Sequence, residues 1–218
     1  FKLQTENFSS ISATLGRGAR DAMVTAGIIA FALVSLFIIA LYRIPGLVAC
    51  IALVGQIAGS IACVSGFFPN IPSFTMTLPG IAGIILSIGM GVDANVITSE
   101  RIKEELALGK TLDGAIDSGF HRTFAAIFDG NITMVLVAGV LMGAFGPPGS
   151  VFSRMFTGIF RWFGPSATGA IYSFGFTLIV GVIFNFLMGV TASRLMLKSI
   201  SKFKPLKKAW LYGGAKND

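Results

Sequence analysis

The chain of 218 residues is strongly apolar: 54% of its residues are hydrophobic and only 12% are charged. About 25% of the residues of a typical soluble domain are charged, so this composition excludes an ordinary soluble protein and indicates an integral membrane protein. The formal net charge is +7, from 17 Lys and Arg against 10 Asp and Glu. Such an excess usually belongs to cytoplasmic loops and lipid-facing tails, so membrane lipids, and no nucleic acid, are expected as partners.

The N-terminal residues 1–21 are polar and mixed in character. The sequence Leu15-Gly16-Arg17-Gly18 is typical of a break between two domains. Because the first residue is Phe1 and no signal peptide precedes the first apolar run, we expect a fragment whose upstream exported domain is missing.

Five apolar stretches are long enough to cross a bilayer, which takes about 20 helical residues. They are residues 22–42, 47–68, 77–99, 123–145 and 170–197. The sequence therefore predicts an all-α integral membrane protein with five transmembrane helices. Small residues allow such helices to pack closely. The glycines expected at helix contacts are Gly55, Gly59, Gly80, Gly83, Gly89 and Gly91.

Residues 100–122, between the third and fourth stretches, are densely charged. Their apolar residues recur at helical spacing, Gly109 interrupts the pattern, and Thr111 can cap a helix that follows. We therefore expect two short amphipathic helices that lie against the bilayer or the bundle.

Residues 147–165, between the last two stretches, are bounded by Gly and Pro and place phenylalanines at helical spacing. This pattern favours an outer interfacial helix over a merely ordered loop. Residues 198–218 form a basic tail with Trp210 and Tyr212, a combination suited to an anionic leaflet surface.

The basic residues predict the orientation of the chain. If the C-terminus is cytoplasmic, twelve lysines and arginines lie inside and five lie outside, as the positive-inside rule requires. Residue Phe1 would then start on the outer face.

The third stretch contains one carboxylate, Asp93, and Asn95 follows two residues later. An acid within the membrane costs roughly 2.5 to 3.5 kcal/mol on insertion scales, so it usually has a function. Asp93 is therefore the first candidate for a site that takes up and releases an ion.

The fourth stretch carries a second acid, Asp129, together with Asn131 and Thr133. Counting about 1.5 Å per residue places Asp93 and Asp129 at one depth, about 10 Å inside the cytoplasmic boundary. If they face each other, repulsion and desolvation would allow the pair to hold a proton or a cation near neutral pH. Alternatively, Arg122 neutralises Asp129, and the amides and hydroxyls only join helices by hydrogen bonds.

An enzymatic interpretation has little support. The run Gly89-Met90-Gly91-Val92-Asp93 resembles the GxGD motif of intramembrane aspartyl proteases, but Val92 separates Gly91 from the acid and no Tyr-Asp partner occurs. The sequence has no metal-binding cluster, nucleophile motif or phosphate loop either. We therefore expect no enzyme activity, no metal and no cofactor.

Three runs of the sequence carry a family resemblance: Thr77 to Gly83 (TLPGIAG), Ile88 to Val96 (IGMGVDANV) and Glu100 to Glu105 (ERIKEE). Together with Ile127 to Thr133 they resemble the SecD family of protein-export membrane proteins, in the RND transporter superfamily. The resemblance extends well from residue 22 to residue 131.

This resemblance implies the second to sixth helices of a six-helix SecD half. It also implies a SecF-like partner subunit, the SecYEG translocon and translocating secretory proteins as partners, in the cytoplasmic membrane of a bacterium. The proton or sodium gradient would assist translocation. Asp93 matches the ion-coupling residue of the family, and Asn95, Asp129 and Asn131 match its polar neighbours. The arginine that completes the relay comes from the SecF half.

Two other functions remain open. The chain could be a structural scaffold of a translocase, with its acids and amides acting only in helix packing. It could also be part of an RND-type transporter of small molecules or lipids.

Overall fold

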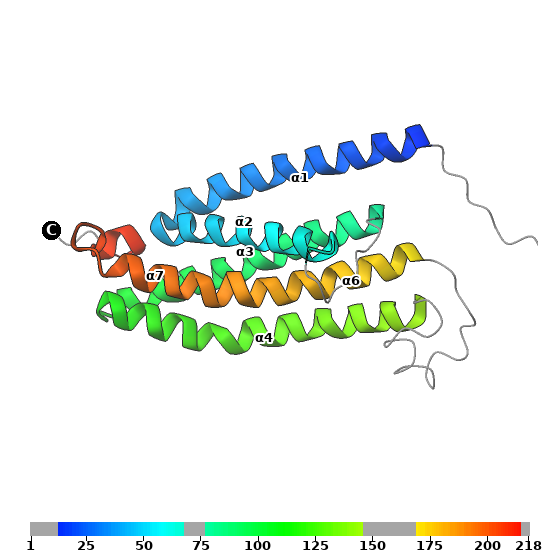
Figure 1. Cartoon of the computed structure of the whole chain (residues 1–218). Coiled ribbons are helices and arrows are strands. Elements are labelled where there is room, and N and C mark those ends of the chain that lie inside the picture. The colour runs from blue at the N-terminus through cyan, green and yellow to red at the C-terminus, as the bar shows by residue number, and fades with distance from the viewer. Residues whose placement is uncertain (1–12, 68–76, 146–168, 215–218) are drawn as a thin grey trace, which may run out of the picture.

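The computed structural model describes residues 13–67, 77–145 and 169–214, and it shows a bundle of long helices (Figure 1). The helices are α1 (Ala13–Tyr42), α2 (Ile44–Val64), α3 (Leu78–Ala107), α4 (Leu112–Phe145) and α6 (Gly169–Phe184), and α6 continues into the π-helical segment η2 (Asn185–Ala192) and α7 (Ser193–Ser201). Two 3₁₀ turns, η3 (Lys204–Leu206) and η4 (Ala209–Tyr212), follow. Among these residues, five helical stretches are long and apolar enough to span a membrane. The predicted all-α membrane fold is confirmed.

The centre of the bundle is formed by α3 and α6. Helix α3 packs against α2, α4 and α6, and α6 packs against α2, α3 and α4. Helices α1 and α4 lie at opposite edges of the bundle in Figure 1. Since α1 packs mainly on α2, its large apolar residues such as Ile28, Leu33 and Leu36 are exposed, as expected of a helix surrounded by lipid.

Local signals explain where α3 begins and ends. The Thr77 hydroxyl accepts a hydrogen bond from the Gly80 amide (3.2 Å), and a proline occupies the first turn. The helix ends before Gly109, whose φ of 84° suits glycine. The Gly114 amide then donates to the Thr111 hydroxyl (3.3 Å) at the start of α4.

The expectation of two separate amphipathic helices over residues 100–122 is wrong. The charged residues belong to the ends of α3 and α4, which extend past the apolar stretches and meet at a short turn around Gly109. No helix breaker lies between residues 100 and 107, so the backbone hydrogen bonds of α3 continue through the charged residues.

Helix α1 begins at Ala13 and runs without interruption through Leu15-Gly16-Arg17-Gly18, so the expected boundary between two domains, which stays a prediction, is not a break in the helix. Isolated glycines cost a helix only about 1 kcal/mol each, and the long apolar run that follows outweighs this cost. The interfacial helix expected over 147–165 lies outside the described residues.

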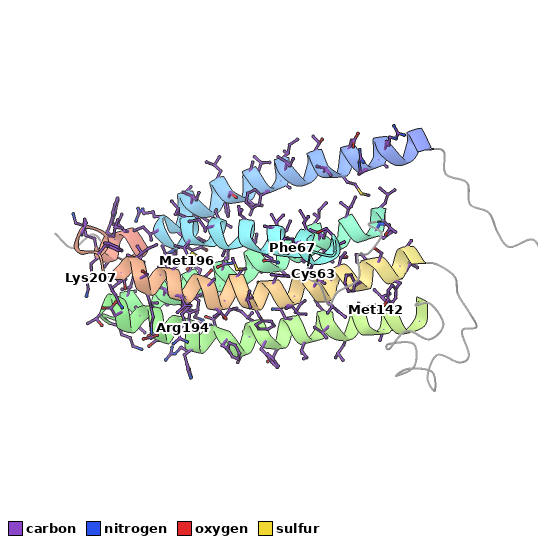
Figure 2. The ribbon with its side chains drawn as sticks, in the orientation of Figure 1. Cys63, Phe67, Met142, Arg194, Met196 and Lys207 are labelled. Atoms are coloured by element: carbon purple, nitrogen blue, oxygen red, sulfur yellow. The ribbon has the colours of Figure 1, made fainter. Side chains whose placement is uncertain are left out.

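A second core lies at the end of the bundle that holds the α1–α2 junction, the α3–α4 turn and the C-terminus, on the left in Figure 1. We call this the C-terminal end. Its buried residues come from α2, α3, α4, α7 and η4; they are Val48, Ile102, Leu112, Ile116, Phe120, Leu197 and Tyr212. The tail therefore folds back onto the helices. Figure 2 shows Lys207 at this end and Met142 toward the other.

The junction between α1 and α2 is a single residue, Arg43, with a φ of 54° that is unusual for a side chain other than glycine. Its Nη1 donates to the Trp210 carbonyl (2.6 Å), and its guanidinium lies 4.1 Å from the centroid of the Trp210 ring. The C-terminal tail therefore holds Arg43 by a charge-assisted hydrogen bond and a cation–π contact.

The glycines predicted at helix contacts differ in their surroundings. A Cβ on Gly55, Gly59, Gly80, Gly83 or Gly91 would collide with a side chain of another helix. Gly89 is different, because nothing lies within 4 Å of the position a Cβ would take. The expectation of a close contact at Gly89 is therefore wrong within the described chain.

Gly91 and Gly89 allow a matched test of close packing. Gly91→Ala is expected to destabilise the bundle by about 1–3 kcal/mol, because the methyl group would overlap Gln56 Oε1. Gln56 cannot easily retreat, since its Nε2 donates to the Ser87 carbonyl (2.8 Å). Gly89→Ala should cause no loss. Thermal unfolding in detergent measures both, and equal midpoints for the two variants would contradict the expectation.

Candidate functional site

The first candidate residue, Asp93, lies on the exposed face of α3. Its neighbours along this face are Leu86, Gly89 and Ile97, all exposed and apolar. Asp93 has no hydrogen bond or ion pair with any residue of the described chain. An unpaired carboxylate within a membrane-spanning helix is costly, so the carboxylate needs a proton, a cation or a positively charged group from elsewhere.

The second candidate acid, Asp129, lies on the exposed face of α4. Thr133, one turn later, is also exposed, and its hydroxyl donates to the Asp129 backbone carbonyl (3.2 Å) rather than to the carboxylate. Along the same side of α4 run the large exposed apolar residues Ile132, Leu136 and Val140. This surface is mostly apolar and carries a single acid.

The two acids do not form a pair in the described chain. No hydrogen bond joins Asp93 to Asp129, and both side chains point out of the bundle core. Arg122, which could have neutralised Asp129, instead forms an ion pair with Glu105 (2.9 Å). The arrangement in which Asp93 and Asp129 share one proton is therefore absent.

The amides next to the acids are buried instead of exposed. The Nδ2 atoms of Asn95 and Asn131 donate to the carbonyls of Gly91 (2.8 Å) and Ile127 (2.7 Å), each four residues earlier in the same helix. The Oδ1 atom of Asn95 accepts from the Ser193 hydroxyl (3.0 Å), and that of Asn131 accepts from the Asn185 amide (3.2 Å). Asn95 and Asn131 therefore join α3 and α4 to the helix that contains η2.

A second polar contact holds α2 in the bundle. Gln56 is fully buried, and its Nε2 donates to the carbonyls of Ser87 (2.8 Å) and Gly181 (3.4 Å) on two different helices. Gly181 is required there because a Cβ would collide with Ser87. This contact is polar but neutral, so it fits a role in helix packing.

Ion pairs gather at the C-terminal end. The buried carboxylate of Glu105 pairs with Lys110 (2.6 Å) as well as with Arg122, which fixes the turn between α3 and α4. Asp117 pairs with Arg194 (3.0 Å) and Lys198 (2.7 Å). Figure 2 shows Arg194, a residue of α7, on the side of its helix that faces α4. The basic residues of the last helix are thus partly used within the protein.

The sequence predicts Asn185 as a neutral partner of the acids, but it does not predict Ser193 as a site residue. Asn185 gives a signal in the sequence, since it is a polar residue within an apolar stretch. Ser193 gives none, because serine is common in membrane helices and its partner Asn95 is 98 residues away in sequence.

Comparisons with known proteins give a consistent result. Residues 1–202 match the family described as "Protein export membrane protein SecD/SecF, C-terminal". The chain is 42% identical over 210 residues to protein translocase subunit SecD of Leptotrichia buccalis, covering 96% of this chain and 45% of that protein. It is 38% identical to protein translocase subunit SecDF of Bacillus subtilis, covering 94% of this chain and 25% of that protein.

A solved structure has the same fold. The crystal structure of SecDF, a translocon-associated membrane protein from Thermus thermophilus, aligns with a TM-score of 0.72 at 33% identity, covering 88% of this chain and 23% of that one. The chain thus spans less than half the length of the relatives named here. Since the match extends over nearly all of its residues, the chain belongs to the SecD/SecF family of protein-export membrane proteins.

Proposed function

We propose that the chain is the membrane part of a SecD-type subunit that uses an ion gradient to assist the translocation of secretory proteins. Family membership supports the link to protein export. The observation that carries the ion-coupling step is the unpaired, exposed Asp93 on the membrane-spanning helix α3. A carboxylate in that position gains stability from each proton or cation it binds, so its occupancy can follow the gradient across the membrane.

The surface around Asp93 favours contact with a protein partner over contact with lipid alone. Lipid would cover Leu86 and Ile97 equally well, but lipid tails offer no positive charge for the acid. We propose that a SecF-like subunit covers this face and supplies a cation to Asp93. The SecYEG translocon is the proposed channel that the complete assembly serves.

Ion binding explains the acids better than hydrolysis does. An aspartyl protease needs two carboxylates that share a proton, and Asp93 and Asp129 have no contact in the described chain. We propose that Asp93 binds a proton or a sodium ion, without an enzymatic step and without a cofactor, and that Asn95, Asp129, Asn131 and Thr133 modulate this binding.

The orientation follows from the charges. Basic residues concentrate at the C-terminal end of the bundle: Arg43, Arg101, Lys103, Lys110, Arg122, Arg194, Lys198, Lys202, Lys207 and Lys208. Arg17 and Arg20 lie near the start of α1, at the other end. We propose that the C-terminal end faces the cytoplasm of a bacterial-type cell, as the positive-inside rule predicts.

The test compares the wild-type full-length subunit with Asp93→Asn in membrane vesicles, with and without an imposed ion gradient. The proposal requires that the gradient accelerates export only in the wild type. An equal response of both proteins would reject it.

The buried amides favour a second candidate, a structural scaffold. Asn95 on α3, Asn131 on α4 and Gln56 on α2 each form a hydrogen bond to another helix without any charge. A scaffold requires that substitution of Asp93 reduces the amount of the partner that co-purifies, whereas the coupling function requires an unchanged complex that no longer responds to the gradient.

A further inference from the structure

The same three-residue pattern occurs on both acid-bearing helices: Asp93-Ala94-Asn95 on α3 and Asp129-Gly130-Asn131 on α4. In each pattern the aspartate is exposed and the asparagine is buried. Residues two positions apart point about 200° apart around a helix with 3.6 residues per turn. The rotation that keeps an asparagine inside the bundle therefore also determines the direction in which the neighbouring acid points.

Both asparagines are held by one partner helix, at the two limits of its π-helical segment. Asn185, which donates to Asn131 Oδ1 (3.2 Å), is the first residue of η2. Ser193, which donates to Asn95 Oδ1 (3.0 Å), follows its last residue. The Ser193 hydroxyl also lies 3.2 Å from the Met188 carbonyl of its own helix, but the contact with Asn95 is the shorter one. Thus η2 is tied to α4 at one end and to α3 at the other.

Apolar contacts keep η2 close to both helices. Val190 packs in one buried cluster with Ala94 of α3 and Ile127 of α4. At Gly189, the position of a Cβ would lie only 2.5 Å from Asn185 Oδ1 and 3.5 Å from Asn95 Nδ2, so a larger residue would displace the Asn185 side chain. A small rotation of α3 or α4 would break one of these contacts.

Packing alone does not explain why a polar residue occupies position 185. Its side chain is completely buried, and its Oδ1 atom has no hydrogen-bond partner among the described residues. A leucine of nearly the same shape would avoid the desolvation of this oxygen. Buried polar groups that reduce stability are retained in some proteins because they select one arrangement of helices. In addition, π-helical segments occur frequently at functional sites.

We propose that Asn185 and Ser193 are positioning residues: through Asn131 and Asn95 they fix the rotation of α4 and α3, and so the directions of Asp129 and Asp93. This inference rests on the proposed function, in which Asp93 binds the coupling ion. It assigns to η2 the role of a rigid template between the two acid-bearing helices.

The test uses the full-length subunit in membrane vesicles, with export measured at a series of imposed ion gradients and pH values. One variant is Asn131→Leu with Asn185→Leu, which removes both members of a hydrogen bond and leaves neither unpaired. The other is Ser193→Ala. The double variant should reach wild-type amounts and unfold at the wild-type temperature, whereas Ser193→Ala leaves the buried Asn95 Oδ1 without its donor and should unfold at a somewhat lower temperature. In both variants, the gradient needed for half-maximal export, measured per folded protein, should rise by about fivefold or more.

Two control substitutions lie close by. Thr191→Ala changes an exposed residue of η2 whose hydroxyl contacts only the Phe186 carbonyl of its own segment (3.1 Å). Ser199→Ala changes an exposed serine of α7. Neither should alter the dependence of export on the gradient. A double-mutant cycle adds a second readout: Asn131→Leu and Asn185→Leu should be non-additive, whereas Asn131→Leu and Ser193→Ala, which share no hydrogen bond, should be closer to additive.

The outcomes separate this inference from the proposed function. Positioning is supported if the gradient profile, measured per folded protein, shifts in both variants. It is overturned if both variants export like the controls, or if export falls only in proportion to the amount of folded protein. If Asp93→Asn abolishes the response to the gradient in either of these cases, the proposed function stands without the inference. If Asp93→Asn exports normally, both are rejected.

Discussion

Replacing Asp93 by Asn is expected to abolish the acceleration of protein export by an ion gradient. The amide has nearly the shape of the carboxylate, so the exposed face of α3 should keep its form, and a neutral side chain is cheaper to hold in the membrane than an acid. An amide cannot take up a proton near neutral pH and has no charge to hold a cation. Export of a secretory protein into membrane vesicles, with and without the gradient, measures the effect.

Another exposed acid of α3 provides the control for Asp93→Asn. Glu104 lies on the same helix, is exposed, and pairs with Arg101 (2.6 Å) at the C-terminal end. Glu104→Gln removes a charge that lies beyond the apolar part of α3, and exposed ion pairs contribute little, so the response to the gradient should stay at the wild-type level. Asp93→Glu should keep a response, since it retains an acid. A normal response of Asp93→Asn would contradict ion coupling at this residue.

Removal of the Tyr212 side chain should reduce the stability of the fold more than the Gly91→Ala substitution does. The residue is 1% exposed and fills the core at the C-terminal end between Ile102, Ile116 and Leu197. Tyr212→Ala is expected to reduce the free energy of unfolding by about 3–5 kcal/mol, as is usual for a large aromatic residue in a core. Unfolding of the purified subunit in detergent, followed by circular dichroism against temperature or denaturant, measures the loss.

The matched variant Tyr212→Phe should be as stable as the wild type or more stable. The Tyr212 hydroxyl is buried and has no hydrogen-bond partner in the described chain, so its removal avoids a desolvation penalty and leaves the ring in place. A loss of stability in Tyr212→Phe close to that of Tyr212→Ala would show that the hydroxyl, and not the packing of the ring, matters.

Tyr212 should also make the stability of the fold depend on pH in the alkaline range. Burial, with a smaller contribution from the nearby Asp113 carboxylate, raises the pKa of Tyr212 from 10.0 to about 12. Between these values the unfolded chain releases the phenol proton and the folded chain keeps it, so stability should be unaffected below pH 10 and decrease as the pH rises toward 12. The Tyr212→Phe variant has no phenol proton to release, so its stability should decrease less between pH 10 and pH 12. If the stability of the variant and of the wild type had the same pH profile, Tyr212 would not be the cause of the decrease.

The boundaries of α3 show what local signals can predict. The predicted apolar stretch began at residue 77, where the structure has Thr77 as the cap of α3, and Gly109 was expected to interrupt the helical pattern, as it does after the end of α3. The mistake was to end the helix where the charges begin. Charged residues are good helix formers, so a change from apolar to charged residues marks the limit of the apolar span and not that of the helix.

The acids and amides show where sequence reasoning stopped. Asp93 and Asp129 stood out because a carboxylate in an apolar stretch is costly, and that argument requires no structure. The helical rise per residue predicts that the two acids lie at the same depth in the membrane, but it says nothing about the directions in which they point. The structure turns both outward and turns Asn95 and Asn131 inward, where they contact a third helix.

The sequence by itself determined the class of the protein, its five spans and its unusual acids, because span length and the cost of charge depend only on the apolar character of each stretch. Only the tertiary structure decided the rotation of each helix, the partners of Asn95 and Asn131, the π-helical form of η2 and the return of Tyr212 to the core. The physical reason is that a helix apolar on all sides can face lipid with any side, so its rotation depends on close contacts between small and polar residues far apart in the sequence.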